Sequence, residues 1–188
     1  MIIPSAEPPG ITLLTIGDSA TEGDGIADRL RDAWPYLLLS EALSPNDQLV
    51  NGALDGATAA DALAEQAPLA AQVRANDVAI WIGAEDLVAS TPVARFQSDY
   101  QSLVQEVQAA GARRVLLADL PLSFGRQTAQ IDDAVRSVAR ATNAQLVELA
   151  NATVPRVLAD DSGPSLVPNE QGQRAVADAF ERALRTGG

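Results

Sequence analysis

The sequence contains neither cysteine nor histidine. The absence of cysteine excludes disulfides and thiolate metal sites. The absence of histidine removes the commonest general base near neutral pH and the commonest metal ligand. A zinc site would have to consist of carboxylates alone, which is rare. We therefore expect a protein without a bound metal and without a cofactor.

Positive charge is also scarce, since 13 basic residues face 25 acidic ones and the net charge is -12. An acidic surface repels phosphate backbones and anionic lipids, so we expect neither a nucleic-acid partner nor a membrane partner. No apolar run approaches the roughly 20 residues of a membrane helix. Residues 1–5 lack the basic and apolar regions of a signal peptide. These features favour a cytoplasmic protein, and they leave its oligomeric state open.

The length of 188 residues fits one domain. Residues 1–10 contain three prolines and are interpreted as an extended N-terminal arm. Residues 11–188 are then a single domain. Aromatic residues are few, and the sequence indicates no substrate pocket built from them.

Short apolar runs alternate with segments of helical periodicity in this domain. Continuous apolar runs are typical of parallel strands that are covered on both faces. Strands are expected at residues 11–16, 48–50, 77–82, 113–118 and 145–149. Helices are expected at residues 28–43, 58–74, 93–107, 131–138 and 169–185. The alternation predicts an α/β fold with a parallel sheet of about five strands.

Ligands of such sheets bind at the carboxyl ends of the strands, which makes the loops after the strands the candidate site. The first loop reads Gly17-Asp18-Ser19-Ala20-Thr21-Glu22-Gly23. A serine that follows a buried strand and opens a helix can serve as a nucleophile with part of an oxyanion hole beside it. The alternative is that Ser19 only caps a helix.

Two further loops carry glycines and carboxylates. The second loop, residues 51–58, contains glycines that permit a close approach of the backbone, or it is simply a turn before a Thr58 cap. The third loop, residues 83–86, presents Glu85 and Asp86 directly after a strand. These two acids are either acid–base groups or acids favoured by the dipole at a helix start.

The order and spacing of these loops resemble the SGNH (GDSL) hydrolase family over about residues 11–185. The resemblance implies a three-layer α/β/α, flavodoxin-like fold and an esterase, lipase, thioesterase or acyltransferase activity. It implies that Ser19 is the nucleophile, in a block that Asp18 and Thr21 also match. It further implies that Gly56 is a backbone oxyanion donor, in a block that begins at Asn51.

The chain departs from the family pattern at three positions. Glu85 stands where the family has an asparagine that donates to the oxyanion. In the last block, Pro168-Asn169 and Gly172 match, but Val167 stands at the position of the catalytic histidine. Pro164 stands at the position of the acid, and Asp161 is a possible acid just upstream. The standard Ser-His-Asp hydrolysis is therefore excluded.

Two functions from different classes remain. The first is an enzyme that uses Ser19 with the carboxylates of Asp18 and Glu85 for non-standard acid–base or acyl chemistry on a small molecule. Burial of Glu85 would raise its pKa for this purpose, and Asn51, Thr21 and Asp86 would line the crevice. The second is an inactive pseudoenzyme that binds a small ligand or a protein partner. A phosphate or flavin site at Ser19 is disfavoured by the acids around the first loop.

Overall fold

The computed structural model describes residues 10–126, 128–151, 154 and 166–186. Five strands form one sheet in the order β2-β1-β3-β4-β5, and all neighbouring strands are parallel. The strands are β1 (Thr12–Gly17), β2 (Gln48–Asn51), β3 (Asp77–Trp81), β4 (Arg114–Ala118) and β5 (Gln145–Val147). The sequence-based prediction of an α/β fold with a five-stranded parallel sheet is confirmed. Of the predicted N-terminal arm, only Gly10 lies among the described residues.

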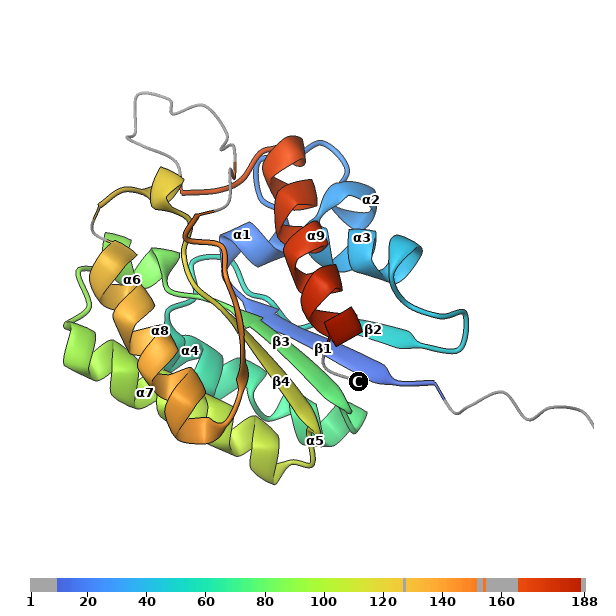
Figure 1. Cartoon of the computed structure of the whole chain (residues 1–188), viewed down its shortest axis with the longest axis horizontal. Coiled ribbons are helices and arrows are strands. Elements are labelled where there is room, and N and C mark those ends of the chain that lie inside the picture. The colour runs from blue at the N-terminus through green and yellow to red at the C-terminus, as the bar shows by residue number, and fades with distance from the viewer. Residues whose placement is uncertain (1–9, 127, 152–153, 155–165, 187–188) are drawn as a thin grey trace, which may run out of the picture.

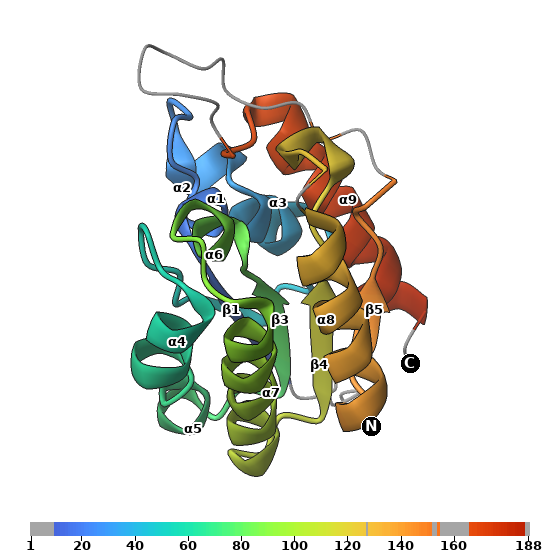
Figure 2. The same ribbon diagram turned by 90° about the vertical axis from the view of Figure 1, so that its left-hand side faces the viewer.

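Helices cover both faces of the sheet (Figures 1 and 2). On one face α3 packs against α9, and on the other α7 lies between α4 and α8. The long helices are α3 (Trp34–Glu41), α7 (Val93–Ala109), α8 (Thr128–Thr142) and α9 (Glu170–Thr186). The short helices are α1 (Ser19–Glu22), α2 (Arg29–Asp32), α4 (Ala59–Asp61), η1 (Ala62–Gln66), α5 (Leu69–Val73), α6 (Ala84–Val88) and η2 (Leu122–Phe124).

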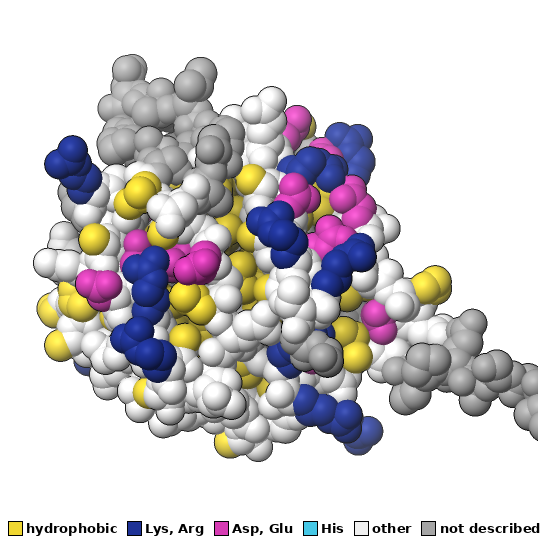
Figure 3. Space-filling model, in the orientation of Figure 1, with side chains coloured by type: hydrophobic (Ala, Val, Ile, Leu, Met, Phe, Trp, Pro, Cys, Tyr) yellow, Lys and Arg dark blue, Asp and Glu magenta, His cyan; other side chains and the backbone are white. Residues whose placement is uncertain are grey.

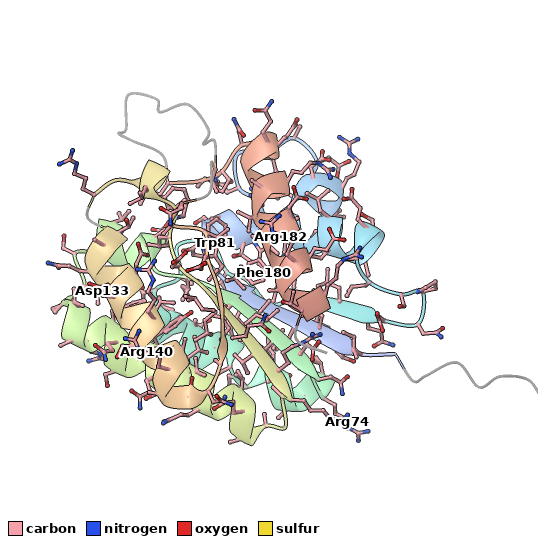
Figure 4. All side chains as sticks on the ribbon, in the orientation of Figure 1. Arg74, Trp81, Asp133, Arg140, Phe180 and Arg182 are labelled. Atoms are coloured by element: carbon pink, nitrogen blue, oxygen red, sulfur yellow. The ribbon has the colours of Figure 1, made fainter. Side chains whose placement is uncertain are left out.

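A stacked aromatic pair joins two helices on one face of the sheet. Trp34 of α3 stacks on Phe180 of α9, with ring centroids 4.4 Å apart, and both side chains are fully buried. Figure 4 shows Phe180 between α9 and the sheet. Burial of a large apolar side chain stabilises the fold by about 1.5–3 kcal/mol. This pair therefore fixes α9 and α3 to each other on one face of the sheet.

Two of the predicted helices are broken. The segment 28–43 forms α2 and α3, because Ala33 adopts an extended conformation between them. Pro35 then lies in the first turn of α3, where its missing N–H is harmless. The segment 58–74 forms α4, the wide turn η1 and α5. Pro68 has no N–H to donate to the helical turn before it. The chain accommodates this through η1, a wider π-helical turn that comes just before Pro68.

The last strand is shorter than predicted. β5 ends at Val147, two residues before the end of the apolar run. The backbone N–H groups of Leu149 and Ala150 donate to Oδ1 of the buried Asp119, at 2.5 Å and 2.7 Å. Arg136 of α8 donates to Oδ2 of the same carboxylate at 2.6 Å. A buried ion pair, rather than the strand ladder, thus satisfies this part of the backbone.

Charged side chains gather on the surface over α8 and over the side formed by α9, α2 and α3 (Figure 3). Asp133 and Arg140 belong to α8 and Arg182 belongs to α9, whereas Trp81 of β3 is buried (Figure 4). No helix in the described parts of the chain has the length and apolarity needed to cross a membrane.

Candidate active site

The candidate site lies where the strand order reverses. The chain runs from β1 to β2 on one side of it and then crosses to β3 on the other. In parallel sheets the carboxyl ends of strands at such a reversal are the usual place for a ligand. The loops that follow β1, β2 and β3 carry Ser19, the pair Asp55 and Gly56, and Glu85.

Gly17 allows the first of these loops to turn directly after β1. Its backbone N–H and C=O are both bonded to the side-chain amide of the buried Gln66, at 2.9 Å each. A Cβ on Gly17 would lie 2.1 Å from Oγ1 of Thr21 and 2.6 Å from the carbonyl oxygen of Trp81. Only glycine therefore lets α1 fold back against the end of β3.

Asp18 and Thr21 hold the turn that presents Ser19. Oδ1 of Asp18 accepts the backbone N–H of Ala20 at 3.0 Å and so caps α1. The hydroxyl of Thr21 donates to the carbonyl oxygen of Trp81 at 3.2 Å, which fastens α1 to β3. Ser19 is consequently fixed as the first residue of α1. Thr21, predicted as a lining residue, makes its hydrogen bond away from Ser19.

Three loops converge on the hydroxyl oxygen of Ser19. The backbone N–H of Gly56 donates to Oγ at 2.9 Å. The hydroxyl itself donates to Oδ1 of Asp55 at 2.5 Å. Oε1 of Glu85 lies 3.4 Å from the same oxygen. A serine hydroxyl, a backbone donor and two carboxyl groups thus meet within hydrogen-bonding distance.

The two other predicted members of these loops have different tasks. Oδ1 of Asn51 accepts from the hydroxyl of Thr15 at 2.9 Å and from the N–H of Ala53 at 3.2 Å, so it shapes the loop. Oδ2 of the buried Asp86 accepts the N–H of Ala59 at 2.9 Å, which ties α6 to α4. Among the described hydrogen bonds, neither side chain reaches Ser19.

Burial raises the pKa of the carboxyl groups on this edge. The pKa of Asp18 rises to about 7, chiefly because the group is desolvated, against the opposing hydrogen bond from Ala20. The pKa of Glu85 is raised by burial first; its hydrogen bond with Ser19 opposes the rise, and the charges of Asp55 and Asp86 reinforce it. Burial likewise raises the pKa of Asp86. Such groups hold a proton more readily than free carboxylates do.

The described residues offer no cluster of three or more potential metal ligands. The groups that meet at Ser19 are its hydroxyl, the backbone N–H of Gly56 and the carboxyls of Asp55 and Glu85.

The sequence around this site matches a known family. Residues 15–175 match the sequence model of the GDSL-like Lipase/Acylhydrolase family. The chain belongs to this family. The match spans all three loops of the site and extends to the start of α9. A comparison with curated proteins finds no significant match.

Solved structures share the fold over nearly the whole chain. The crystal structure of TesA has a TM-score of 0.76 and 26% identity, covering 93% of this chain and 98% of that one. The psychrotrophic esterase EstA from Pseudoalteromonas sp. has a TM-score of 0.73 and 24% identity, covering 94% and 97%. A catalytic mutant of Axe2, an acetylxylan esterase from Geobacillus stearothermophilus, has a TM-score of 0.76 and 21% identity, covering 93% and 94%.

The last block of the family pattern is retained here as an anchor for α9. Oδ1 of Asn169 accepts the N–H of Gly172 at 3.0 Å, at the start of the helix. The buried Gln173 accepts the N–H of Trp34 at 3.0 Å and donates to the carbonyl oxygen of Ala20 at 2.9 Å. Val167, which the resemblance predicts to stand at the position of the family histidine, is half-buried just before this anchor. The possible acid Asp161 lies outside the described residues.

Sequence reasoning missed Asp55. The second loop was interpreted through its glycines and through Asn51, although a carboxylate stands directly before the glycine expected to donate to the oxyanion. Adjacent residues in a tight turn can both contact the same atom. The position of Asp55 next to Gly56 was therefore the sequence signal for its contact with Ser19. In this GDSL-like protein the shortest described hydrogen bond of the Ser19 hydroxyl goes to Asp55, at 2.5 Å.

Proposed function

We propose that this protein is a serine acyl hydrolase that works at mildly acidic pH and that carboxyl groups perform the proton transfers for which its relatives use histidine. The observation that supports the proposal most directly is the convergence of Gly56, Asp55 and Glu85 on Oγ of Ser19. The substrate class is a small carboxylic ester, in keeping with the GDSL-like family and its esterase structures.

In the proposed reaction Ser19 attacks the carbonyl carbon of the ester, and the hydroxyl proton passes to a neighbouring carboxylate. The carbonyl oxygen becomes an oxyanion, which the N–H of Gly56 stabilises. Collapse of the intermediate breaks the bond to the alcohol and leaves Ser19 acylated. Water then cleaves the acyl-enzyme and regenerates the hydroxyl.

Glu85 serves as a hydrogen-bond donor in this proposal. The hydroxyl of Ser19 has one hydrogen, and the shorter contact directs it toward Asp55. The contact with Glu85 is then one that a protonated Glu85 makes as a donor, and its raised pKa favours this form. A protonated Glu85 presents an O–H group where the family has an asparagine amide. An ionised Glu85 would repel the oxyanion, so activity should fall as pH rises.

The test is release of acetate from p-nitrophenyl acetate across pH 4–9. We expect slow turnover with a maximum below pH 7, because Glu85 must keep its proton while another carboxylate must be ionised. Ser19→Ala should abolish turnover, whereas Ser98→Ala, which removes an exposed hydroxyl on α7, should leave it unchanged. A profile that rises steadily to pH 9, or equal turnover by Ser19→Ala, would contradict the proposal.

A second candidate is a binding protein without turnover. The observation that favours it is Val167, an apolar side chain at the position of the catalytic base. This candidate predicts no acetate release at any pH and no covalent adduct at Ser19 with a fluorophosphonate probe. It also predicts equal binding of a non-hydrolysable ester analogue by the wild type and Ser19→Ala.

A further inference from the structure

Two carboxyl groups flank the hydroxyl of Ser19, but they are not equivalent. Oδ1 of Asp55 lies 2.5 Å from Oγ and Oε1 of Glu85 lies 3.4 Å away. A hydroxyl donates one hydrogen at a time, and the shorter contact has the distance of a strong O–H···O⁻ bond. We propose that Asp55 is the general base that takes the proton from Ser19. This inference rests on the proposed function and names the proton acceptor in it.

The backbone around Asp55 fixes its position from both sides. Before it, the N–H of Leu54 donates to the carbonyl oxygen of Gly17 at 3.2 Å, which attaches the loop to the end of β1. After it, the N–H of Ala57 donates to the carbonyl oxygen of Leu54 at 3.2 Å and closes a tight turn. Thr58 and Asp61 then form a reciprocal capping box at the start of α4.

Gly56 completes this turn with a φ of +69°, in the left-handed region. That conformation aims the N–H of Gly56 at Oγ while the side chain before it accepts the hydroxyl proton. One turn therefore supplies both the proton acceptor and an oxyanion donor. A family member with histidine draws these two functions from separate segments, so the turn accounts for proton transfer in a chain that contains no histidine.

The two carboxyl groups differ in solvent exposure, and this difference suits them to different roles. Asp55 is exposed to water. Glu85 is half-buried in the first turn of α6, and burial together with the charge of Asp55 raises its pKa. A charged Asp55 therefore favours a protonated Glu85. Two neighbouring carboxyls with different surroundings can therefore differ in role, with Asp55 taking the proton and Glu85 donating a hydrogen bond.

The proton balance closes with Asp55 alone. Attack of Oγ forms the bond to the acyl carbon while its proton moves to Oδ1 of Asp55. That proton then goes to the departing alkoxide as the ester bond breaks. In the second half, water gives a proton to Asp55 as its oxygen attacks the acyl-enzyme, and Asp55 returns it to Oγ of Ser19. The net reaction is ester and water to acid and alcohol.

The test compares Asp55→Asn with Glu65→Gln, which neutralises an exposed acid on η1 away from the site. Asparagine keeps a side-chain acceptor for the hydroxyl but cannot take its proton. We expect kcat for p-nitrophenyl acetate to fall by about 10²–10⁴, which is typical for loss of a general base. KM should change less than threefold. Glu65→Gln should behave as the wild type.

Chemical rescue separates a base from a merely positional residue. Asp55→Ala should lose activity to a similar extent and recover at least tenfold with added formate, a small carboxylate that can occupy the vacated space. Asp55→Asn within threefold of the wild type, in a protein that Ser19→Ala inactivates, would overturn the assignment of Asp55 but leave the proposed function intact. Failure of formate to rescue Asp55→Ala would also count against it. Absence of any Ser19-dependent turnover in the wild type would instead refute the proposed function.

Discussion

The position of Glu85 shows how one side chain can change the working pH of a site. The residue stands where the family has a neutral donor, and it can donate only while it holds a proton. Its half-buried place in α6 and the charges of Asp55 and Asp86 all favour that proton. Under the proposed function, the site would thus replace a donor that works at any pH with one that is lost as pH rises.

We predict that Glu85→Gln retains activity and extends it to higher pH. The amide keeps a donor near Oγ of Ser19, and it does not ionise. Glu85→Ala removes the donor altogether and should lower kcat about 10²–10³-fold, the usual cost of one oxyanion-hole donor. The measurement is the pH profile of kcat for p-nitrophenyl acetate between pH 4 and 9. Loss of all activity in Glu85→Gln would show that Glu85 must exchange a proton in the reaction.

At the scale of the elements, Gly17 is the residue at which the chain turns from β1 into α1. A side chain there would collide with Oγ1 of Thr21 and with the backbone of Trp81, whose carbonyl oxygen cannot move without disturbing β3. Such overpacking costs roughly 1–3 kcal/mol and sometimes more. The same change would displace α1 and with it Ser19.

We therefore predict that Gly17→Ala lowers the free energy of unfolding by about 2–3 kcal/mol and reduces kcat as well. Denaturant unfolding and acetate release measure the two effects. Gly111→Ala is a useful comparison, because a Cβ there meets nothing within 4 Å and only its positive φ is unfavourable. Stability losses of equal size in the two variants would mean that the crowding at Gly17 is relieved elsewhere.

The strands were easier to predict than the short helices. Continuous apolar runs such as 77–82 have one stable placement, a parallel strand buried on both faces, and β3 is buried at every residue. The breaks at Ala33 and before Pro68 depend on tertiary contacts and on alternative turn geometries. Helical periodicity does not encode either of these. The sequence therefore yields the order and position of the site loops but not the local path of the chain between them.

The same distinction explains which site residues could be foreseen. Ser19, Gly56 and Glu85 follow strands whose carboxyl ends share one edge, so their proximity follows from topology. The hydrogen bonds that occupy Asn51, Thr21 and Asp86 depend on side-chain orientation within each loop. The contact of Asp55 with Ser19 depends on the left-handed turn at Gly56. The spacing of residues in the sequence specifies neither these side-chain orientations nor the left-handed turn.

At the scale of the whole molecule, the acidity of the chain extends into its interior. Asp18 is 2% exposed and Asp132 of α8 is also buried, and desolvation raises their pKa values to about 7 and about 6. A buried carboxyl with a raised pKa binds its proton more tightly in the folded state than in the unfolded state. Its contribution to stability is complete below the unfolded pKa and is lost as pH rises through the folded pKa.

The protein should accordingly be less stable at pH 8 than at pH 5. A change of one in pKa corresponds to about 1.4 kcal/mol. For Asp18, the interval from 3.8 to about 7 amounts to roughly 4 kcal/mol of stability lost by pH 8. General repulsion within a chain of net charge -12 acts in the same direction. A variant that changes only Asp18 is needed to separate the two effects.

We predict that Asp18→Asn raises the melting temperature at pH 8, and raises it less at pH 5, where only part of the interval between the two pKa values of Asp18 has been crossed. Asparagine retains an oxygen that can accept the N–H of Ala20, so the cap of α1 is kept while the buried charge is removed. Glu65→Gln removes one charge from the surface and serves as the control for general repulsion. Thermal unfolding of all three proteins at pH 5, 6, 7 and 8 is the measurement. The gap between Asp18→Asn and the wild type should widen between pH 5 and 8, and a gap that is the same at every pH would show that Asp18 does not titrate in this range.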